Sequence, residues 1–277
     1  MRAREDGTVL VNVLVTLALA ATLLHVMITG QERAIDRAVA MSARAQARVL
    51  AEGGVASVIT ALRRDMVEGP DADHFSEPWA QVVQAEIMLP EGRYSVSVED
   101  AQARFNINLL VEPTVQSMQL FSRLLAALDI PEGTGAATVR ALANGPVLSL
   151  EDLARRGVGE DVLEQLTPHI VALPEPTAIN LNTAERVVLQ ALLGNERAAR
   201  GLLARRSAKG ALTTQDLRAL GLVQPIGSGW TSGFFDVSVV AEVDGVRQHV
   251  RSRVQRVADG ETNSVFELRR FHGAFLP

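Results

Sequence analysis

The chain has 277 residues, a formal net charge of −5 and no cysteine. The absence of cysteine excludes disulfide bonds and thiolate metal sites. The acidic balance leaves the chain as a whole without the basic character of nucleic-acid-binding proteins. With 47% hydrophobic residues, the chain is long enough to bury one or two cores.

The first predicted element is an apolar helix close to the N-terminus. A polar leader, residues 1–7, precedes 23 positions from Thr8 to Gly30 that contain no Asp, Glu, Lys or Arg, and twelve of them are Val, Leu or Ile. As a helix this stretch spans about 35 Å, which exceeds the roughly 30 Å hydrocarbon core of a bilayer. We therefore predict that residues 8–30 cross a membrane, with the leader in the cytoplasm because its arginines outweigh its acids in setting orientation. A cleaved secretory signal is the alternative, since Ala18-Leu19-Ala20 resembles a cleavage site.

Beyond the predicted membrane segment the pattern stays helical. Apolar residues recur at spacings of three and four, the stripe of an amphipathic helix: Val55, Val58, Ile59, Leu62 and Met66. We predict one helix over residues 8–66, whose second half, residues 31–66, packs on a soluble body. Residues 67–92 are rich in acids and prolines and predict a loop around a short helix. Within it, Asp71-Ala-Asp73-His74 is interpreted as an acidic surface loop, with metal ligation as the alternative.

Strands are predicted on both sides of a helical stretch. Residues 94–98 alternate with period two and residues 104–107 follow a polar turn, which predicts a β-hairpin. Near the C-terminus, further strands are expected over residues 235–239, 246–257 and 265–268. Asp244-Gly245 is a strong hairpin-turn signal between the first two of these strands.

Residues 110–225 are predicted to be helical. The expected helices cover residues 115–128, 136–143, 149–156, 160–171, 183–193, 195–206 and 213–220. This block is therefore interpreted as an inserted helical domain within one antiparallel sheet. Residues 67–109 and 226–277 would together form the α/β body, so the predicted fold class is α+β.

The inserted segment contains an internal repeat. Leu148-Ser-Leu-Glu-Asp-Leu153 matches Leu212-Thr-Thr-Gln-Asp-Leu217, and each copy has the spacing of a capping box. An Asn-apolar-Asn pair precedes each copy, Asn106-Ile-Asn108 and Asn180-Leu-Asn182. Because Asn side chains accept backbone N–H groups at helix starts, we expect Asn182 to cap the helix that follows it. Two helix-hairpin-helix-like units in one insertion is the simplest account.

Taken in chain order, these features resemble the minor pseudopilin K family of the type II secretion system. The resemblance rests on the leader that ends in Gly7, the apolar helix, the Asn106-Ile-Asn108 segment and a second motif made of Ile179, Asn180, Leu181, Asn182, Thr183 and Ala184. It implies a pilin-like fold, in which a long N-terminal helix packs on a small antiparallel sheet that carries a large helical insertion. It also implies that prepilin peptidase cuts between Gly7 and Thr8 and methylates the new N-terminus.

The resemblance implies a structural function without enzymatic activity. Members of the family are minor pseudopilins at the tip of the periplasmic pseudopilus, where they serve protein export across the outer membrane. The implied partners are minor pseudopilins I and J, with H as a further candidate, and the inner-membrane assembly platform. The implied location is the cell inner membrane, crossed once with a cytoplasmic N-terminus, and later the periplasmic pseudopilus.

Asn12 would be the fifth residue after cleavage, where most pilin-like subunits have Glu. A carboxylate within lipid costs about 2.5–3.5 kcal/mol unless it pairs with the N-terminal amine of the subunit above. A tip subunit has no subunit above it, so Asn12 fits a tip position. A tolerated polar residue without such a role is the alternative.

No cofactor is required by these features. Known relatives bind calcium in the helical domain, but they carry a Trp-x-Asp-x-Asp stretch and a Gly-Ala-Glu segment, and residues 129–146 contain neither. Calcium is therefore a candidate by resemblance only. The five histidines show no ligand spacing, and no nucleophile or phosphate-loop motif is present, so no catalytic residue is predicted.

The alternative function is a membrane-anchored helix-hairpin-helix receptor that binds DNA for uptake. Gly157-Val-Gly159 has the hairpin form whose backbone N–H groups can approach a phosphate. However, residues 110–225 hold 11 Lys or Arg against 12 Asp or Glu, and phosphate contacts dominate DNA affinity. Nucleic acid is therefore a disfavoured partner. Basic residues on a C-terminal strand are interpreted as a solvated face, with a partner contact as the alternative: Arg251, Arg253 and Arg256.

Overall fold

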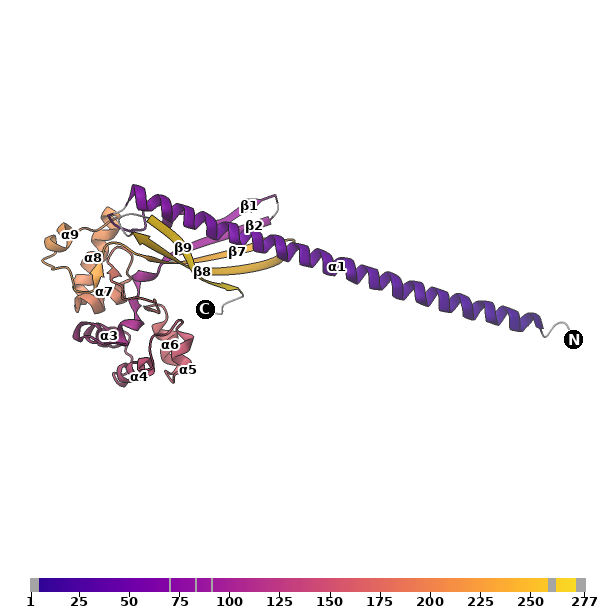
Figure 1. The fold of residues 1–277 in the computed structure, drawn as a ribbon, viewed down its shortest axis with the longest axis horizontal. Coiled ribbons are helices and arrows are strands. Elements are labelled where there is room, and N and C mark those ends of the chain that lie inside the picture. Colours follow the sequence, from indigo (N-terminus) through magenta and orange to yellow (C-terminus); the bar gives the residue numbers. More distant parts are fainter. Residues whose placement is uncertain (1–4, 70, 83, 91, 259–262, 273–277) are drawn as a thin grey trace.

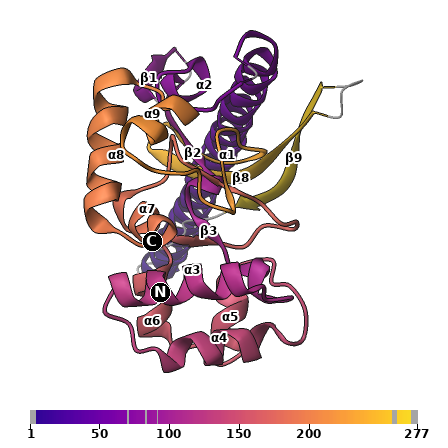
Figure 2. The same cartoon turned by 90° about the vertical axis from the view of Figure 1, so that its left-hand side faces the viewer.

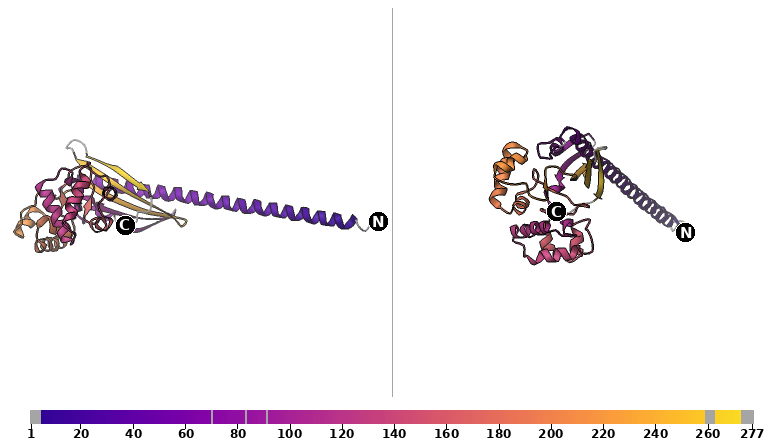
Figure 3. Two further views of the ribbon diagram at one scale, coloured as in Figure 1. Left: turned by 90° about the horizontal axis from the view of Figure 1, so that it is seen from below. Right: turned by 60° about the vertical axis from the view of Figure 1, so that its left-hand side comes forward.

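A computed structural model describes residues 5–69, 71–82, 84–90, 92–258 and 263–272 (Figure 1). Its first element is one continuous helix, α1 (Glu5–Glu68), which confirms the predicted long helix. The first side chain buried along α1 is that of Ala43, so the N-terminal half stands clear of the rest of the chain (Figures 1 and 3). This free half is long and apolar enough to cross a membrane. We call it the stem.

A five-stranded antiparallel sheet packs against the C-terminal half of α1. Its order is β1 (Gln84–Leu89), β2 (Gly92–Asp100), β7 (Phe234–Val243), β8 (Val246–Ala258) and β9 (Asn263–His272). The predicted C-terminal strands are thus confirmed. Asp244 and Gly245 both have positive φ, 48° and 78°, the backbone that a two-residue hairpin turn requires.

The predicted hairpin between residues 94–98 and 104–107 is wrong. β2 pairs with β1, which arises in the segment predicted as a loop, and with β7. After β2, the Asp100 carboxylate accepts the N–H of Gln102 and starts the 3₁₀ turn η2 (Ala101–Ala103), so the chain leaves the sheet. The next strand, β3 (Phe105–Asn106), pairs in parallel with β4 (Ile170–Val171), 65 residues further on.

The interface between α1 and the sheet is apolar. The stripe predicted on the helix is buried there, with Val55, Val58 and Leu62 at most 1% exposed. Gly54 lets the helix approach closely, because a Cβ on it would lie 2.8 Å from Cγ1 of Val239. The short helix α2 (Pro78–Gln81) closes the end of this core through Trp79, which is fully buried.

Helices fill the segment between β2 and β7 (Figure 2). They are α3 (Val115–Ala127), α4 (Gly133–Leu142), α5 (Glu151–Arg155), α6 (Glu160–Leu166), α7 (Arg186–Leu193), α8 (Glu196–Lys209) and α9 (Thr214–Ala219), with the 3₁₀ turn η3 (Ile107–Leu110) before them. The predicted helix 160–171 is too long, since Pro168 cannot continue the helical hydrogen bonds and residues 170–171 form β4.

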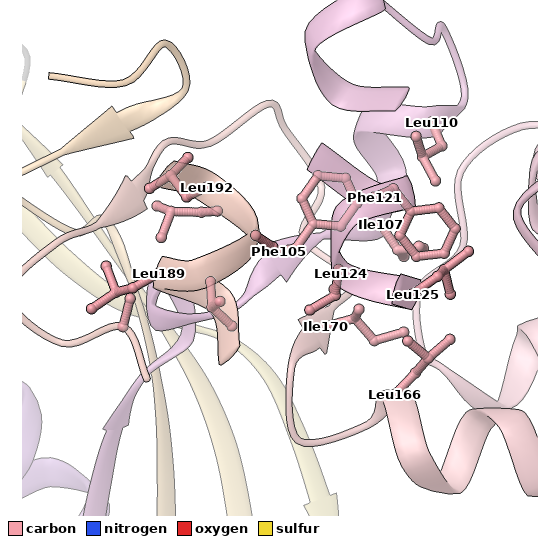
Figure 4. Close-up of a cluster of buried hydrophobic side chains, with 14 of the residues drawn as sticks. Phe105, Ile107, Leu110, Phe121, Leu124, Leu125, Leu166, Ile170, Leu189 and Leu192 are labelled. Carbon is pink, nitrogen blue, oxygen red and sulfur yellow. The ribbon is translucent and has the colours of Figure 1, made fainter. Parts of the chain in front are cut away.

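One hydrophobic cluster joins these helices (Figure 4). At its centre the rings of Phe105 and Phe121 stack with centroids 5.7 Å apart. Phe105 comes from the strand that follows η2, and Phe121 comes from α3, so the cluster ties the helices to the chain just outside the sheet.

The internal repeat is visible in the hydrogen bonds. Each unit starts with a two-residue strand that pairs in parallel with a strand at the end of the unit: β3 with β4, and β5 (Ile179–Asn180) with β6 (Ser228–Gly229). After the repeated Asp-Leu pair, the N–H of Val158 donates to Leu153, and the N–H of Leu222 donates to Leu217 in the same way. The two units therefore share one backbone plan.

The insertion emerges at the end of the sheet that lies away from the stem. β2 ends there and β7 begins there, and these two strands are neighbours (Figures 1 and 3). The helices therefore project beyond the sheet on the side opposite the N-terminus.

Candidate functional site: a buried polar junction

The residues predicted for processing and assembly lie on the stem. Gly7 and Thr8 belong to the first turns of α1, and residues 1–4 of the predicted leader lie outside the described residues. Asn12 is exposed, and its backbone carbonyl accepts the hydroxyl of Thr16 at 2.8 Å. The roles expected for these residues remain predictions.

The second motif lies where the insertion meets the sheet. All six of its residues are buried: Ile179, Asn180, Leu181, Asn182, Thr183 and Ala184. They are held within the fold instead of forming a surface, and they bring together three distant segments of the chain. We call the polar side chains that meet there the polar junction: Asp73, Asp100, Asn180, Thr183, Ser232 and Arg256.

Asn180 is the centre of the polar junction. Its Nδ2 lies 3.0 Å from the carbonyl oxygen of Asp73, 2.9 Å from Oδ2 of Asp100 and 3.0 Å from Oγ of Ser232. Its Oδ1 accepts the N–H of Asn182 at 2.9 Å. One fully buried side chain thereby links the loop after α1, the end of β2 and the segment before β7.

Asp100 is held by neutral donors. Besides Asn180, its carboxylate accepts the hydroxyls of Thr183 at 2.5 Å and Ser232 at 2.6 Å, and the N–H of Gln102 at 2.7 Å. Burial raises the pKa of this carboxyl, while these hydrogen bonds act in the opposite direction. The hydrogen bonds compensate for the loss of water around a group that is 3% exposed.

The expected capping role of Asn182 is wrong. Its Oδ1 accepts the N–H of Leu212 at 2.7 Å, while the N-cap position of α7 is Glu185, which makes no side-chain capping bond. Asn108 acts in the same way in the first unit, where its Oδ1 accepts the N–H of Val147 at 2.9 Å. Each asparagine thus fixes the chain just before the repeated helix start of its own unit.

Arg256 connects the polar junction to α1. It is 10% exposed at the side chain, and it pairs with Asp65 at 2.8 Å and with Asp73. Arg253, also on β8, forks onto Asp236 with contacts of 2.8 and 3.0 Å. The interpretation of these two arginines as a solvated face is therefore wrong, because both form ion pairs with buried carboxylates.

Three acidic residues converge beside Arg256. Asp65, Asp73 and Glu77 are 2%, 0% and 7% exposed, and they can each offer one oxygen within 4.8 Å of the others. Asp73 therefore does not belong to an acidic surface loop, although its neighbour Asp71 is exposed. We call Asp65, Asp73 and Glu77 the acidic cluster.

Electrostatics in the acidic cluster favours protons or cations. Burial, and then the Glu77 carboxylate, raise the pKa of Asp65 to about 6. Burial is also the main reason why the pKa values of Asp73 and Glu77 are raised, with Asp65 adding to the first shift and Asp73 to the second. Two such charges within 4.8 Å of each other repel by at least about 3 kcal/mol at an effective dielectric constant of about 20.

The sequence contains signals that Asp65 and Arg256 are buried and paired. Asp65 lies three positions after Leu62, so a charged residue sits on the apolar stripe of α1. On β8, Arg256 lies an even number of residues after the buried Val250 and Val254, so it belongs to the same face of the strand. A charge on a buried face needs a partner, and the two opposite charges are partners of each other.

The family resemblance implies calcium in the helical insertion, and this stays a prediction. The described residues between 110 and 225 bring no three acidic or histidine side chains close enough to hold a metal ion. The hairpin proposed for DNA also carries acids, since Glu160 and Asp161 occupy the first turn of α6. They would repel a phosphate at that position.

A long N-terminal helix with a free apolar half and a second half packed on an antiparallel sheet defines a pilin-like protein. The sequence model of the family described as "Type II secretion system (T2SS), protein K" matches residues 179–238, which contain the second motif and the return to the sheet. This chain is a relative of type II secretion system protein K, as its motifs predicted.

Relatives and a solved structure agree with this assignment. "Type II secretion system protein K" of Pseudomonas aeruginosa is 28% identical over 230 residues, 69% of each chain. The protein of that name from Klebsiella pneumoniae is 28% identical over 149 residues, 51% of this chain and 44% of the relative. A chain in the crystal structure of the GspK-GspI-GspJ complex from enterotoxigenic Escherichia coli has the same fold, with a TM-score of 0.66 and 20% identity over 86% of this chain and 100% of that chain.

Proposed function

We propose that this chain is a minor pseudopilin of a type II secretion system, that it ends the pseudopilus, and that its role is structural and not enzymatic. One observation carries the proposal. An apolar stem, whose membrane-length window is unburied among the described residues, stands at one end of the molecule, and a helical insertion projects beyond the sheet at the other end (Figure 1). The stem can pack beside similar stems, while the insertion occupies the position of a further subunit. The names of the relatives support this role.

The stem also defines the proposed location. It would cross the inner membrane once, with the N-terminus in the cytoplasm and the sheet and insertion in the periplasm. Prepilin peptidase would cut between Gly7 and Thr8, and the released stem would then enter the pseudopilus. Asn12 would lie near the new N-terminus and would leave no unpaired carboxylate at the tip.

The proposed partners are minor pseudopilins I and J, with H and the inner-membrane assembly platform as further contacts. The matched Escherichia coli structure is a complex of GspK with GspI and GspJ. In this chain, residues from Val9 to Ile28 carry large apolar side chains that are exposed along the stem. Burying them against the helices of other subunits would remove that apolar surface from lipid or water.

The N-terminal mass of the protein tests this proposal. We expect the mature protein, purified from cells that contain the prepilin peptidase, to begin at Thr8 with a methylated amine. A Gly7→Val variant should keep its leader and fail to copurify with pseudopilins I and J. An intact leader in the wild-type protein from secreting cells would refute the pseudopilin assignment.

A binding assay separates the proposal from the DNA-receptor alternative. The full chain in a non-ionic detergent should bind a complex of pseudopilins I and J and should show no salt-dependent affinity for duplex DNA. DNA binding that weakens steeply with salt, without binding to the pseudopilins, would favour the alternative.

A further inference from the structure

The acidic cluster has more negative charge than its surroundings balance. Three carboxylates meet there, and Arg256 is the cation that pairs with two of them among the described residues. If all three acids are ionised, the group of four side chains keeps a charge of −2. A divalent cation would neutralise it.

One oxygen of each carboxylate is already in use. Asp65 gives Oδ2 to Arg256 at 2.8 Å, and Asp73 gives Oδ2 to Arg256 and to the N–H of Ser232. Glu77 gives Oε2 to the N–H of His74 and to Nε1 of Trp79, each at 2.8 Å. Among the described residues, no hydrogen bond to the second oxygen of any of the three acids is seen, so each of these oxygens can accept another ligand.

The remaining oxygen of Asp73 is an independent sign of a missing ligand. Asp73 is fully buried, and its Oδ1 has no hydrogen-bond partner among the described residues. Buried polar atoms in native proteins almost always have a partner. An oxygen left alone beside two other acids lacks either a proton or a cation.

Gly69 lies beside the other two oxygens. A Cβ on Gly69 would lie 2.9 Å from Oε1 of Glu77 and 3.7 Å from Oδ1 of Asp65. These are the two oxygens that the ion pair and the tryptophan do not use. A side chain at position 69 would therefore crowd the Glu77 oxygen, and glycine avoids this contact.

We propose that Asp65, Asp73 and Glu77 bind one calcium-type divalent cation at the C-terminal end of α1. The ligand set consists of carboxylate oxygens, which hard cations prefer. Calcium fits better than magnesium, because calcium accepts irregular oxygen cages of variable size and magnesium demands a regular octahedron. This site lies outside residues 110–225, so it differs from a calcium site in the helical insertion.

The cation would connect α1 to the polar junction. Asp65 belongs to the last turn of α1, while Asp73 and Glu77 belong to the segment that follows. The backbone carbonyl of Asp73 contacts Asn180, and its carboxylate contacts Ser232. A bound cation would therefore fix the segment after α1 in the position that Asn180 needs.

Terbium luminescence and thermal unfolding test the site on the full chain in a non-ionic detergent, after treatment with a chelator. One indole lies at the cluster, because Nε1 of Trp79 donates to Oε2 of Glu77 at 2.8 Å. We expect terbium to show tryptophan-sensitised emission that calcium competes away. Calcium should also raise the Tm, and magnesium at the same concentration should raise it less.

Two variants identify the ligands. In Glu77→Gln, the amide oxygen can still accept from Trp79 and His74, and the amide nitrogen can donate to Asp65. Gly69→Ala keeps all charges but places a methyl group 2.9 Å from Oε1 of Glu77, so that this oxygen must shift. We expect each to weaken calcium binding by at least about tenfold and to retain the wild-type helical circular dichroism. Asp71→Asn, an exposed acid in the same segment, should bind calcium as the wild type does.

Two results would overturn the proposal. In one, calcium leaves the wild-type Tm unchanged while acidification raises it, so that the cluster holds protons instead of a cation. In the other, Glu77→Gln binds calcium as tightly as the wild type, so that the ion lies elsewhere.

Discussion

Replacing Asn180 by Ala should destabilise the fold far more than a typical loss of one asparagine. The substitution removes a donor to the buried carboxylate of Asp100, and hydrogen bonds to charged groups contribute about 1.5–3 kcal/mol. It also leaves the N–H of Asn182 and the carbonyl of Asp73 without this partner, and a buried unsatisfied group costs about 1–3 kcal/mol. Because these terms overlap, we expect the free energy of unfolding to fall by about 4 kcal/mol.

Asn195→Ala is the matched control. Asn195 caps α8 through one exposed hydrogen bond to the N–H of Ala198 at 3.1 Å, and losing such a cap costs about 1 kcal/mol. Urea unfolding of the full chain in a non-ionic detergent, followed by the fluorescence of buried Trp79, measures both variants. If Asn180→Ala costs no more than Asn195→Ala, the junction does not hold the fold together and the reasoning is refuted.

Three further predictions follow from the stem, the helix–sheet contact and the acidic cluster. Gly53→Ala should stabilise the protein by up to about 1 kcal/mol through helix propensity, because a Cβ there would meet no atom within 4 Å. Gly54→Ala should destabilise it, because its Cβ would strike Val239. Urea unfolding should therefore show changes in the free energy of unfolding of opposite sign for the two variants. In the presence of chelator, lowering the pH from 7 to 5 should raise the free energy of unfolding by about 1 kcal/mol more in the wild type than in Asp65→Asn. The reason is that the pKa of Asp65 is raised to about 6 in the folded state. A raised folded-state pKa gives stability that is present at low pH and lost as the pH rises through that pKa. Asn12→Glu should not increase secretion in cells, and a clear gain would contradict the tip position.

Local patterns in the sequence predicted much of the fold. The apolar run, the stripe from Val55 to Met66 and the Asp244-Gly245 turn each depend on neighbours in the chain, so the sequence predicts them correctly. The helical insertion was also predicted, since its repeated helix starts are local signals. The α+β fold class and the family resemblance follow from these local elements.

Local patterns do not predict which strands pair when the partners lie far apart in the sequence. β1 lies among acidic and proline residues and forms only because β2 and β7 provide a sheet to extend. β3 has only two residues, and its partner β4 follows after α3 to α6. Strand propensity reflects packing context, so neither pairing could be inferred from composition.

The candidate site shows the same division between local and distant information. The sequence identifies the second motif, but it predicts that Asn182 caps the next helix, while Asn180 and Asn182 contact segments tens of residues away. Their buried partners Asp100 and Ser232 have no distinctive local pattern. Such a network can be inferred from sequence only when charges on buried faces, such as Asp65 and Arg256, are paired across the chain.

Burying the charged and polar side chains of the polar junction carries a desolvation penalty, which suggests a role other than stability. Apolar side chains of similar volume can stabilise an interface as well as a buried charged network does. Hydrogen bonds, however, are directional, so we expect Asn180, Asp100 and Arg256 to hold the insertion at one angle to α1. A subunit that must close the end of a filament needs that angle, because an insertion free to swing aside would leave the end of the stem bundle open. The junction is therefore better explained by the geometry of the proposed tip than by stability alone.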